Sequence, residues 1–183
     1  MPALFILERF QGVALFEAHE PEDLKELSAS FQELSLPAGQ TVFRQGDDDP
    51  ALFVLVEGAI EISLAVPGGK EALIAVLEPK SVFGESSFFR PSPHHATAVC
   101  RTPVKLLRLS RAAYDELLAR GSLPALRLGA KAAEILAARL QATDNWMAEL
   151  LGEEQQAIAA KWRRFREGLG ASFDVPRGFM HPF

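Results

Sequence analysis

The residues best suited to chemistry form a short run in the middle of the chain. In Phe83-Gly84-Glu85-Ser86-Ser87 a glycine precedes an acid and two small hydroxyl residues. A glycine lets the backbone approach a ligand closely, and the free N–H groups at the start of a following helix attract an anion. Ser86 and Ser87 can add hydroxyl donors, and an ionised Glu85 accepts a hydrogen bond from a sugar hydroxyl. The run predicts a ligand-binding turn for a sugar phosphate, with an ordinary acid at a helix N-terminus as the alternative for Glu85.

Two adjacent histidines, His94 and His95, precede the small residues Ala96 and Thr97. Neighbouring residues on a strand point to opposite faces, so one metal ion would rarely bind both imidazoles. No Ser/His/Asp set, metal-ligand spacing or pair of carboxylates can be placed on one site from the sequence. We therefore expect no metal, no catalytic residue and no enzymatic activity.

The segments that must position these residues change their apolar period along the chain. Between Leu36 and Leu109, apolar residues alternate or form short runs that Gly and Pro separate. Short strands with such punctuation predict an all-β sandwich, roll or barrel. The expected strands are 52–56, 60–66, 73–77, 96–101 and 104–109.

Helical patterns flank the strands. Residues 4–34 have a helical pattern, in which a helix starts at Pro21 and carries acids near the positive end of its dipole. Ser110 is suited to be the N-cap of a helix that Gly121 ends, and a long helix follows from Pro124 to about Leu151. We expect four segments: an N-terminal helical segment (1–35), a strand-rich domain with a short helix (36–120), a long helix (121–151) and a C-terminal helix with a tail (152–183).

An ordered set of glycines at the expected strand ends accompanies the Phe-Gly-Glu turn: Gly39, Gly46, Gly58 and Gly84. Over about Phe10 to Leu151 this set resembles the cyclic-nucleotide-binding domain family, of the catabolite activator protein and cyclic-AMP-dependent kinase regulatory subunit type. The resemblance implies a mainly β fold: an eight-stranded β-roll with N-terminal helices and a long C-terminal helix. It also implies cyclic AMP or cyclic GMP as the ligand, with Glu85 on the ribose 2′-hydroxyl.

The family pattern breaks at the arginine that pairs with the cyclic phosphate. Aligning Ala96-Thr97 with the small residues after this arginine puts His94 at its position, and a shift of one residue puts His95 there. Arginine gives a permanent charge and a two-pronged contact to phosphate, whereas a neutral histidine offers one donor. Losing one charged hydrogen bond weakens binding roughly ten- to a hundred-fold. Three readings stay open: weak cyclic-nucleotide binding, a different ligand, or a pocket that binds nothing.

The long helix carries two apolar faces. One face has the alternating four- and three-residue spacing of a coiled-coil seam: Gly129, Ala133, Leu136, Leu140, Thr143, Met147 and Leu150. The other face is suited to cover the roll: Leu128, Ala132, Ile135 and Trp146. Two such faces predict a homodimer through residues 126–151, and a monomer that packs both faces internally is the alternative.

A short match on the same helix, residues 138–144, adds three candidate contacts. By the resemblance, Thr143 contacts the purine and Asp144 takes the next contact position, where the family has a serine. Arg139 takes the position of a helix arginine that pairs with the pocket glutamate, here Glu85. These residues complete the expected ligand-binding set.

Charge and length limit the partners. The net charge of −5 does not attract nucleic acid or an anionic membrane to the chain as a whole. The N-terminal apolar run is too short to span a membrane and lacks the features of a signal peptide. A single cysteine, Cys100, excludes an internal disulfide and fits a cytoplasmic protein.

The residues after the long helix are expected to contact a partner. Residues 152–183 are too few for the winged helix-turn-helix of the family's transcription factors. The basic run 161–166 is interpreted as a solvated helix face, because no recognition helix follows it. We therefore expect a protein partner through 152–183 and no nucleic acid.

These features predict a non-enzymatic regulatory sensor with a cyclic-nucleotide-binding-like pocket that is degenerate at the phosphate. A ligand in the roll would reposition the long C-terminal helix, which carries the signal. A ligand-independent protein-interaction scaffold is the first alternative, and the missing arginine supports it. A transcriptional regulator of the catabolite activator type with a non-standard DNA contact is the second.

Overall fold

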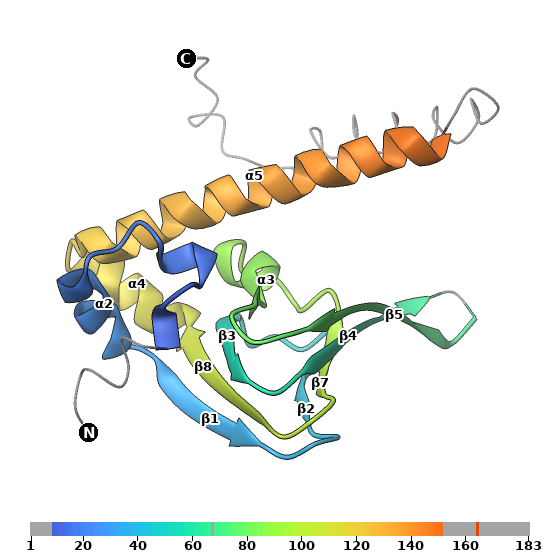
Figure 1. Ribbon diagram of the computed structural model, residues 1–183, viewed down its shortest axis with the longest axis horizontal. Helices are drawn as coiled ribbons and strands as arrows, with labels where there is room; N and C mark the ends of the chain where they lie inside the picture. Colours follow the sequence, from blue (N-terminus) through green and yellow to red (C-terminus); the bar gives the residue numbers. More distant parts are fainter. Residues whose placement is uncertain (1–8, 67, 152–163, 165–183) are drawn as a thin grey trace. The chain divides into compact units, whose positions relative to one another are not determined.

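The computed structural model (Figure 1) describes residues 9–66, 68–151 and 164. Along the described chain, helical segments come before the strands, between the sixth and seventh strands, and after the last strand. Each of the five strands expected from the sequence is present. Within the described residues the strands are β1 (Gln32–Leu36), β2 (Thr41–Phe43), β3 (Ala51–Glu57), β4 (Ile60–Val66), β5 (Lys70–Leu77), β6 (Val82–Phe83), β7 (Thr97–Cys100) and β8 (Val104–Ser110). The helical segments there are the 3-10 turn η1 (Ala14–Phe16), α2 (Pro21–Ser28), α3 (Glu85–Phe89), α4 (Arg111–Ala119) and α5 (Leu123–Leu151).

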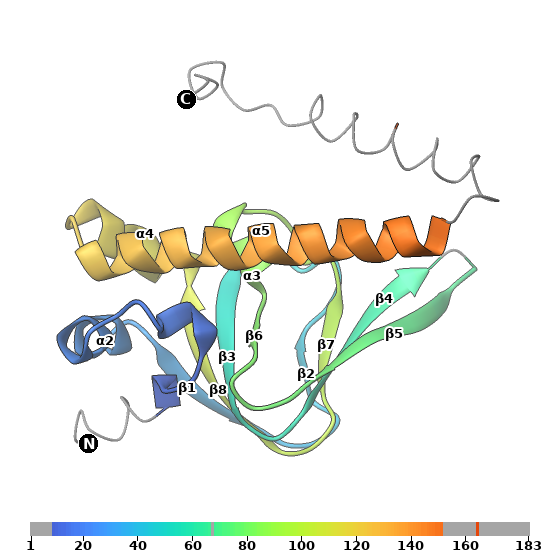
Figure 2. The same cartoon turned by 45° about the horizontal axis from the view of Figure 1, so that its top comes forward.

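The strands form two four-stranded antiparallel sheets, which Figure 2 shows from a second side. One sheet has the order β1-β8-β3-β6 and the other the order β2-β7-β4-β5. Strands far apart in the sequence are neighbours in both, as where Leu34 of β1 lies opposite Leu106 of β8. The mainly β fold is therefore confirmed: an eight-stranded roll with helices before it and a long helix after it.

Strand β3 serves both halves of the core. Its residues 51–55 are all buried. Because successive side chains point to opposite faces, Leu52 and Val54 join one apolar cluster, while Phe53 and Leu55 join the other. Burial on both faces explains why this strand reads as one continuous apolar run.

Strand β1 corrects the helical pattern expected up to residue 34. Residues 32–36 form a strand whose full length pairs with β8. Leu34 and Leu36 pack against the buried cluster that contains Phe53 and Leu106. Their spacing of two suits a strand, and pairing with β8 decides the conformation, so the roll begins inside the segment expected to be helical.

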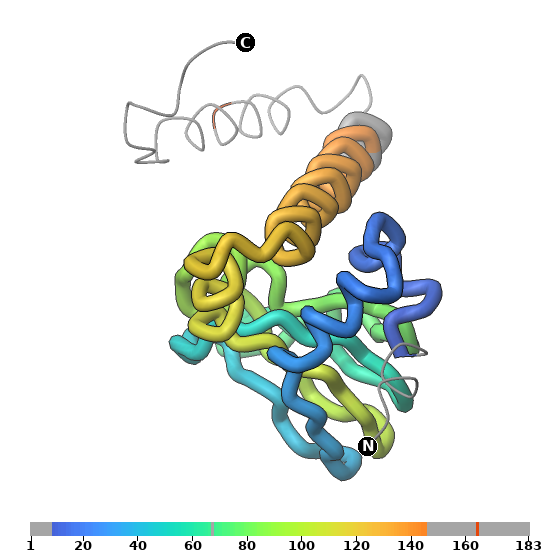
Figure 3. Tube along the Cα trace, turned by 90° about the vertical axis from the view of Figure 1, so that its left-hand side faces the viewer, coloured from blue at the N-terminus to red at the C-terminus, as the bar shows by residue number. Residues whose placement is uncertain are grey.

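Helix α4 leads directly into α5, as the trace in Figure 3 shows in yellow and orange. The Ser110 hydroxyl accepts a hydrogen bond from the Ala113 N–H at 3.2 Å, which confirms the expected N-cap. After α4, Gly121 takes a left-handed φ of 73°, which suits a helix end. Leu128 and Ala132 of α5 are buried in the cluster of β3 and the N-terminal helices, which confirms that face of the long helix as core.

The chain divides into two compact units, Met1–Ile135 and Leu136–Phe183. The first holds the roll, and α5 crosses the boundary between the two. The Trp146 side chain and, apart from Arg164, the expected partner segment 152–183 with its basic run lie outside the described residues. Among the helices that are described, none combines the length and apolarity needed to cross a membrane.

Candidate functional site

The turn between β6 and α3 is fixed by its backbone. Gly84 has a φ of 79° and is the N-cap of α3, so the chain becomes helical at Glu85, as expected. A Cβ at Gly84 would collide with the Ala51 carbonyl oxygen and lie 3.1 Å from the Phe53 ring. Glycine therefore meets both the left-handed conformation and the limited space. Phe83 is buried and stacks on Phe53, with 5.1 Å between ring centroids, which anchors the turn in the core.

The two serines of this turn have different surroundings. Ser86 is exposed, whereas Ser87 is 1% exposed. The Ser87 Oγ lies 2.9 Å from His94 Nδ1 and 3.1 Å from the Gly84 carbonyl oxygen. A hydroxyl has one hydrogen, so Ser87 donates fully to only one of these acceptors at a time. Its side chain is therefore engaged inside the protein.

His94 is a buried part of the fold. It is 4% exposed, and its ring stacks on Phe43 with centroids 3.7 Å apart and 6° between the planes. Its Nε2 lies 3.1 Å from the Asp49 carbonyl oxygen, and because that oxygen can only accept, Nε2 carries the hydrogen. In the neutral ring Nδ1 then accepts from the Ser87 hydroxyl. Both nitrogens of His94 are thus used within the fold.

The surroundings favour the neutral form of this ring. Burial lowers the pKa of His94 from 6.5, because loss of water destabilises the charged imidazolium. The main-chain oxygen of Asp49 and the carboxylates of Asp49 and Asp47 act in the opposite direction, while His95 adds to the lowering. A buried, neutral ring supplies no charge for a phosphate, so His94 cannot replace the missing arginine in this conformation.

Main-chain hydrogen bonds fix the register of the loop that carries His94. The Gly46 N–H donates to the His94 carbonyl oxygen at 2.8 Å, and the His94 N–H donates to the Asp47 carbonyl oxygen at 2.9 Å. This two-way pairing ties the loop to the turn after β2. It holds the His94 side chain towards the core, and the next residue, His95, is exposed.

The three residues after His94 lie nearer the surface. His95 is exposed, and Ala96 and Thr97 are half-buried. The Thr97 Oγ1 accepts a hydrogen bond from the Gln45 N–H at 3.0 Å, so this oxygen is already bonded to the main chain of the turn after β2. His95 is consequently the exposed histidine of the pair, and its contact with a ligand stays a prediction.

Comparison with known proteins places this geometry in a family. The family model described as cyclic nucleotide-binding domain matches residues 33–121. A cyclic AMP receptor protein from Thermus thermophilus is 32% identical over 167 residues, which are 90% of this chain and 76% of that protein. This chain belongs to the cyclic-nucleotide-binding domain family.

Other members of the cyclic-nucleotide-binding domain family show similar agreement. A CRP-like cAMP-activated global transcriptional regulator from Mycobacterium tuberculosis is 29% identical over 147 residues, which are 80% of this chain and 64% of the regulator. The sensor domain of the transcriptional regulator DNR from Pseudomonas aeruginosa matches with a TM-score of 0.61 and 33% identity, covering 76% of this chain and 93% of that one. The chain thus spans less than two thirds of the length of the mycobacterial regulator.

In this member of the family the Ser87–His94 hydrogen bond brings the turn 83–87 and the loop 94–97 together. The ligand contacts expected of these two segments stay predictions. Arg139, Thr143 and Asp144 lie on the part of α5 in the second compact unit. There the Thr143 hydroxyl donates to the Arg139 carbonyl oxygen at 2.9 Å, and the ligand contacts of all three also stay predictions.

Sequence reasoning missed two residues that hold His94, namely Phe43 and Asp49. The turn after Phe43 was visible as Arg44-Gln45-Gly46-Asp47, but nothing local connects it to a histidine 45 residues after Asp49. The stack and the Asp49 hydrogen bond arise only when β2 and β7 pair. In the described part of the chain, no group of three or more His, Cys, Asp and Glu side chains could hold a metal ion.

Proposed function

We propose that this domain is a regulatory sensor that binds cyclic AMP or cyclic GMP weakly, with His95 at the position of the phosphate arginine. The burial of His94 carries the proposal, because it removes one of the two histidines from the ligand side of the loop. Relatives that are named for cyclic AMP support the ligand class. The role is binding and signalling, and no step of catalysis is assigned.

The sugar side of the site rests on the backbone of the Gly84 turn. The glycine conformation sets the direction of α3, so the main chain at Ser86 can approach an anion closely. Glu85 is the first residue of α3 and is half-buried, which suits an acceptor for a ribose hydroxyl. These features do not depend on an arginine. The sugar side of the site is therefore retained although the family's phosphate arginine is replaced by a histidine.

The phosphate side explains why weak binding is proposed. The exposed His95 offers a ligand a ring N–H as a single hydrogen-bond donor. An arginine at this place would give a permanent charge and two parallel donors. The difference corresponds to roughly ten- to a hundred-fold in affinity.

Isothermal titration calorimetry with cyclic AMP and cyclic GMP tests this function. We expect weak, saturable binding by the wild type, tightened about ten- to a hundred-fold by His95→Arg. His95→Gln, which keeps an uncharged N–H donor group, is the matched control and should bind like the wild type. Absence of binding by both the wild type and His95→Arg would reject the proposal and favour the ligand-independent scaffold.

The start of α5 is joined by polar contacts to the N-terminal helical segment within the first unit. The His19 Nε2 lies 3.0 Å from the Pro124 carbonyl oxygen, and the Ser122 hydroxyl donates to the Glu26 carboxylate at 2.5 Å. These contacts join segments about a hundred residues apart in sequence. They support the proposal that a movement of the roll and its N-terminal helices is passed to α5.

We also propose that α5 forms a homodimer through residues 126–151. Leu126 and Leu140 are 55% and 48% exposed, and Ala133 between them is exposed. Leu126, Ala133 and Leu140 share one heptad position of the expected seam, whereas Gly129 faces inward, because a Cβ there would lie 2.7 Å from the Tyr114 hydroxyl of the same chain. The exposed positions are still spaced by seven residues, as in a coiled coil.

Light scattering tests the dimer. Leu126→Asp and Leu140→Asp place a charge in the seam and should convert a dimer into a monomer. Gln141→Asp adds the same charge at an exposed position next to the seam and should leave the dimer intact. A wild type that is monomeric at all concentrations would reject this proposal without affecting the ligand site.

The DNA-binding alternative depends on the run 161–166 and stays a prediction.

A further inference from the structure

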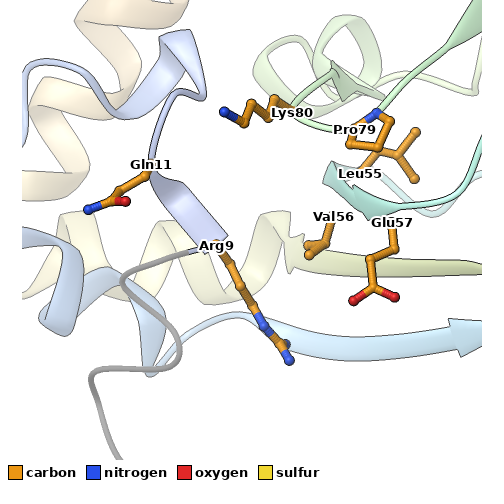
Figure 4. Close-up of a pocket in the computed structure, with 7 residues that line it drawn as sticks. All are labelled: Arg9, Gln11, Leu55, Val56, Glu57, Pro79 and Lys80. Atoms are coloured by element: carbon orange, nitrogen blue, oxygen red, sulfur yellow. The ribbon is translucent and has the colours of Figure 1, made fainter.

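A second candidate site lies at the far end of β3 from the Gly84 turn. Whereas Gly84 packs on Ala51 at the start of this strand, a cavity of about 250 Å³ opens beside its end (Figure 4). Its walls come from the segment before η1, the end of β3 and the connection between β5 and β6. The lining residues are Arg9, Gln11, Leu55, Val56, Glu57, Pro79 and Lys80.

Lys80 occupies a turn position that favours glycine. The Ser81 N–H donates to the Glu78 carbonyl oxygen at 3.1 Å, which closes a β-turn with Pro79 and Lys80 at its centre. Lys80 has a φ of 77°, the value for the third position of a type II turn, where glycine or asparagine is usual. Within the described residues it is the sole non-glycine residue with positive φ. A lysine held in this conformation costs about 1–2 kcal/mol, so its side chain invites a functional explanation.

The amine of this lysine is directed to the opposite wall of the cavity. Figure 4 shows the Lys80 side chain extending from the β5–β6 connection towards the segment that carries Gln11. Its Nζ lies 2.7 Å from the position that a Cβ on Gly12 would take, and Gly12 itself has a φ of 72°. The absence of a side chain at Gly12 therefore gives the ammonium its place. Among the residues that the structure describes, none forms an ion pair or hydrogen bond with this ammonium.

The other charges of the cavity have partners of opposite sign. The Arg9 guanidinium lies 2.5 Å from the Glu33 carboxylate, and the Glu57 carboxylate accepts from the Lys105 ammonium at 2.8 Å. With Arg9 and Glu57 paired in this way, the cavity lining has a net positive charge from Lys80. The remaining walls include the apolar residues Val56 and Pro79, and Leu55, whose side chain is buried in the core, borders the cavity beside them.

We propose that this cavity binds a small monocarboxylate with an apolar body. The carboxylate would accept hydrogen bonds from the Lys80 ammonium, while the body packs against Val56 and Pro79. One charge suits the site, because Arg9 and Glu57 are already paired and the Lys80 ammonium balances a single negative charge. The volume of about 250 Å³ lies below the ~300–1,000 Å³ that is typical of ligand pockets, so we expect a small ligand.

Amide NMR spectra of ¹⁵N-labelled protein, titrated with sodium butyrate and with sodium benzoate, test the site. Sodium chloride at the same ionic strength corrects for screening. We expect saturable shifts of the Gly12, Val56 and Lys80 amides. Lys80→Gly and Lys80→Asn suit the positive φ and keep the turn, and each should weaken binding about tenfold or more. Lys70→Ala removes a charge from an exposed position at the start of β5 and should leave the titration unchanged.

The two Lys80 variants also separate binding from structure. Lys80→Gly should raise the melting temperature of the ligand-free protein, because the strain is released, while the stabilisation by benzoate is lost. Equal binding by the wild type and both Lys80 variants would overturn the proposal, as would the absence of saturable shifts with either carboxylate. Shifts of the same amides with inorganic phosphate but with neither carboxylate would overturn the ligand class. None of these outcomes depends on cyclic-nucleotide binding at the other end of β3.

Discussion

The turn at Gly84 and the loop at His94–His95 lie next to each other, yet they relate to ligand binding in opposite ways. The turn is shaped by a left-handed glycine that the packing against Ala51 requires. In the loop, His94 was expected at the position of the family's phosphate arginine. Its side chain instead lies in the core, where it stacks on Phe43. A backbone feature that the fold needs persists whether or not a ligand binds, whereas a side chain can be reassigned to packing.

The largest effect is expected where the backbone alone decides. Gly84→Ala should lower the free energy of unfolding by about 3 kcal/mol or more, because a left-handed alanine is strained and its Cβ meets the Ala51 carbonyl oxygen. Urea denaturation measures the change. Gly39→Ala is the matched control: Gly39 has the same φ of 79° but no atom within 4 Å of its Cβ position, so it should cost about 1–2 kcal/mol. Equal losses in the two variants would contradict the steric argument.

The next effect separates the two histidines. His94→Ala should destabilise the fold by about 2–3 kcal/mol, because it leaves a cavity beside Phe43 and removes a hydrogen-bond donor from the Asp49 carbonyl oxygen. His95→Ala changes an exposed residue and should stay within about 0.5 kcal/mol. Thermal and urea unfolding compare the two. If His95→Ala were the more damaging change, the assignment of His94 to the core and His95 to the ligand would be reversed.

Acid should destabilise the protein through the same buried ring. The pKa of His94 is lowered in the folded state, so the unfolded chain takes up the proton first as the pH falls. Stability should therefore decrease from about pH 6.5 down to the folded-state pKa, and this contribution is flat below it. The urea midpoint measured against pH should show this slope in the wild type and in His95→Ala. His94→Gln should flatten the slope in that window, and an unchanged slope would assign the titration to another group.

The sequence predicted those parts of the site that local patterns determine. The glycine before an acid and small residues was enough to place a turn and a helix start at residues 84–85, and the Ser110 N-cap followed from the same kind of signal. The orientation of His94 could not be predicted, because main-chain hydrogen bonds to Gly46 and Asp47, almost fifty residues earlier, set the loop that carries it. Its partners Phe43 and Asp49 come from strand and loop pairing across about fifty residues.

The same limit explains the difference between expected and observed features elsewhere. Residues 32–36 became a strand because β8 offered a pairing partner, which no local window reveals. Lys80 drew no attention in the sequence, since a lysine after a proline is ordinary. Its left-handed φ emerges only when Leu55 bonds to both sides of the turn, accepting from the Lys80 N–H at 2.7 Å and donating to the Ser81 carbonyl oxygen at 2.9 Å.

The smallest predicted effect measures the link between the turn and the loop. Ser87→Ala removes the hydroxyl that donates to His94 Nδ1 and should cost about 1 kcal/mol, whereas Ser86→Ala at the exposed neighbour should cost almost nothing. A double-mutant cycle of Ser87→Ala with His94→Ala should give a coupling energy of about 1 kcal/mol. A coupling near zero would mean that the Ser87 hydroxyl donates to the Gly84 carbonyl oxygen instead, and that the turn keeps its shape without help from the loop.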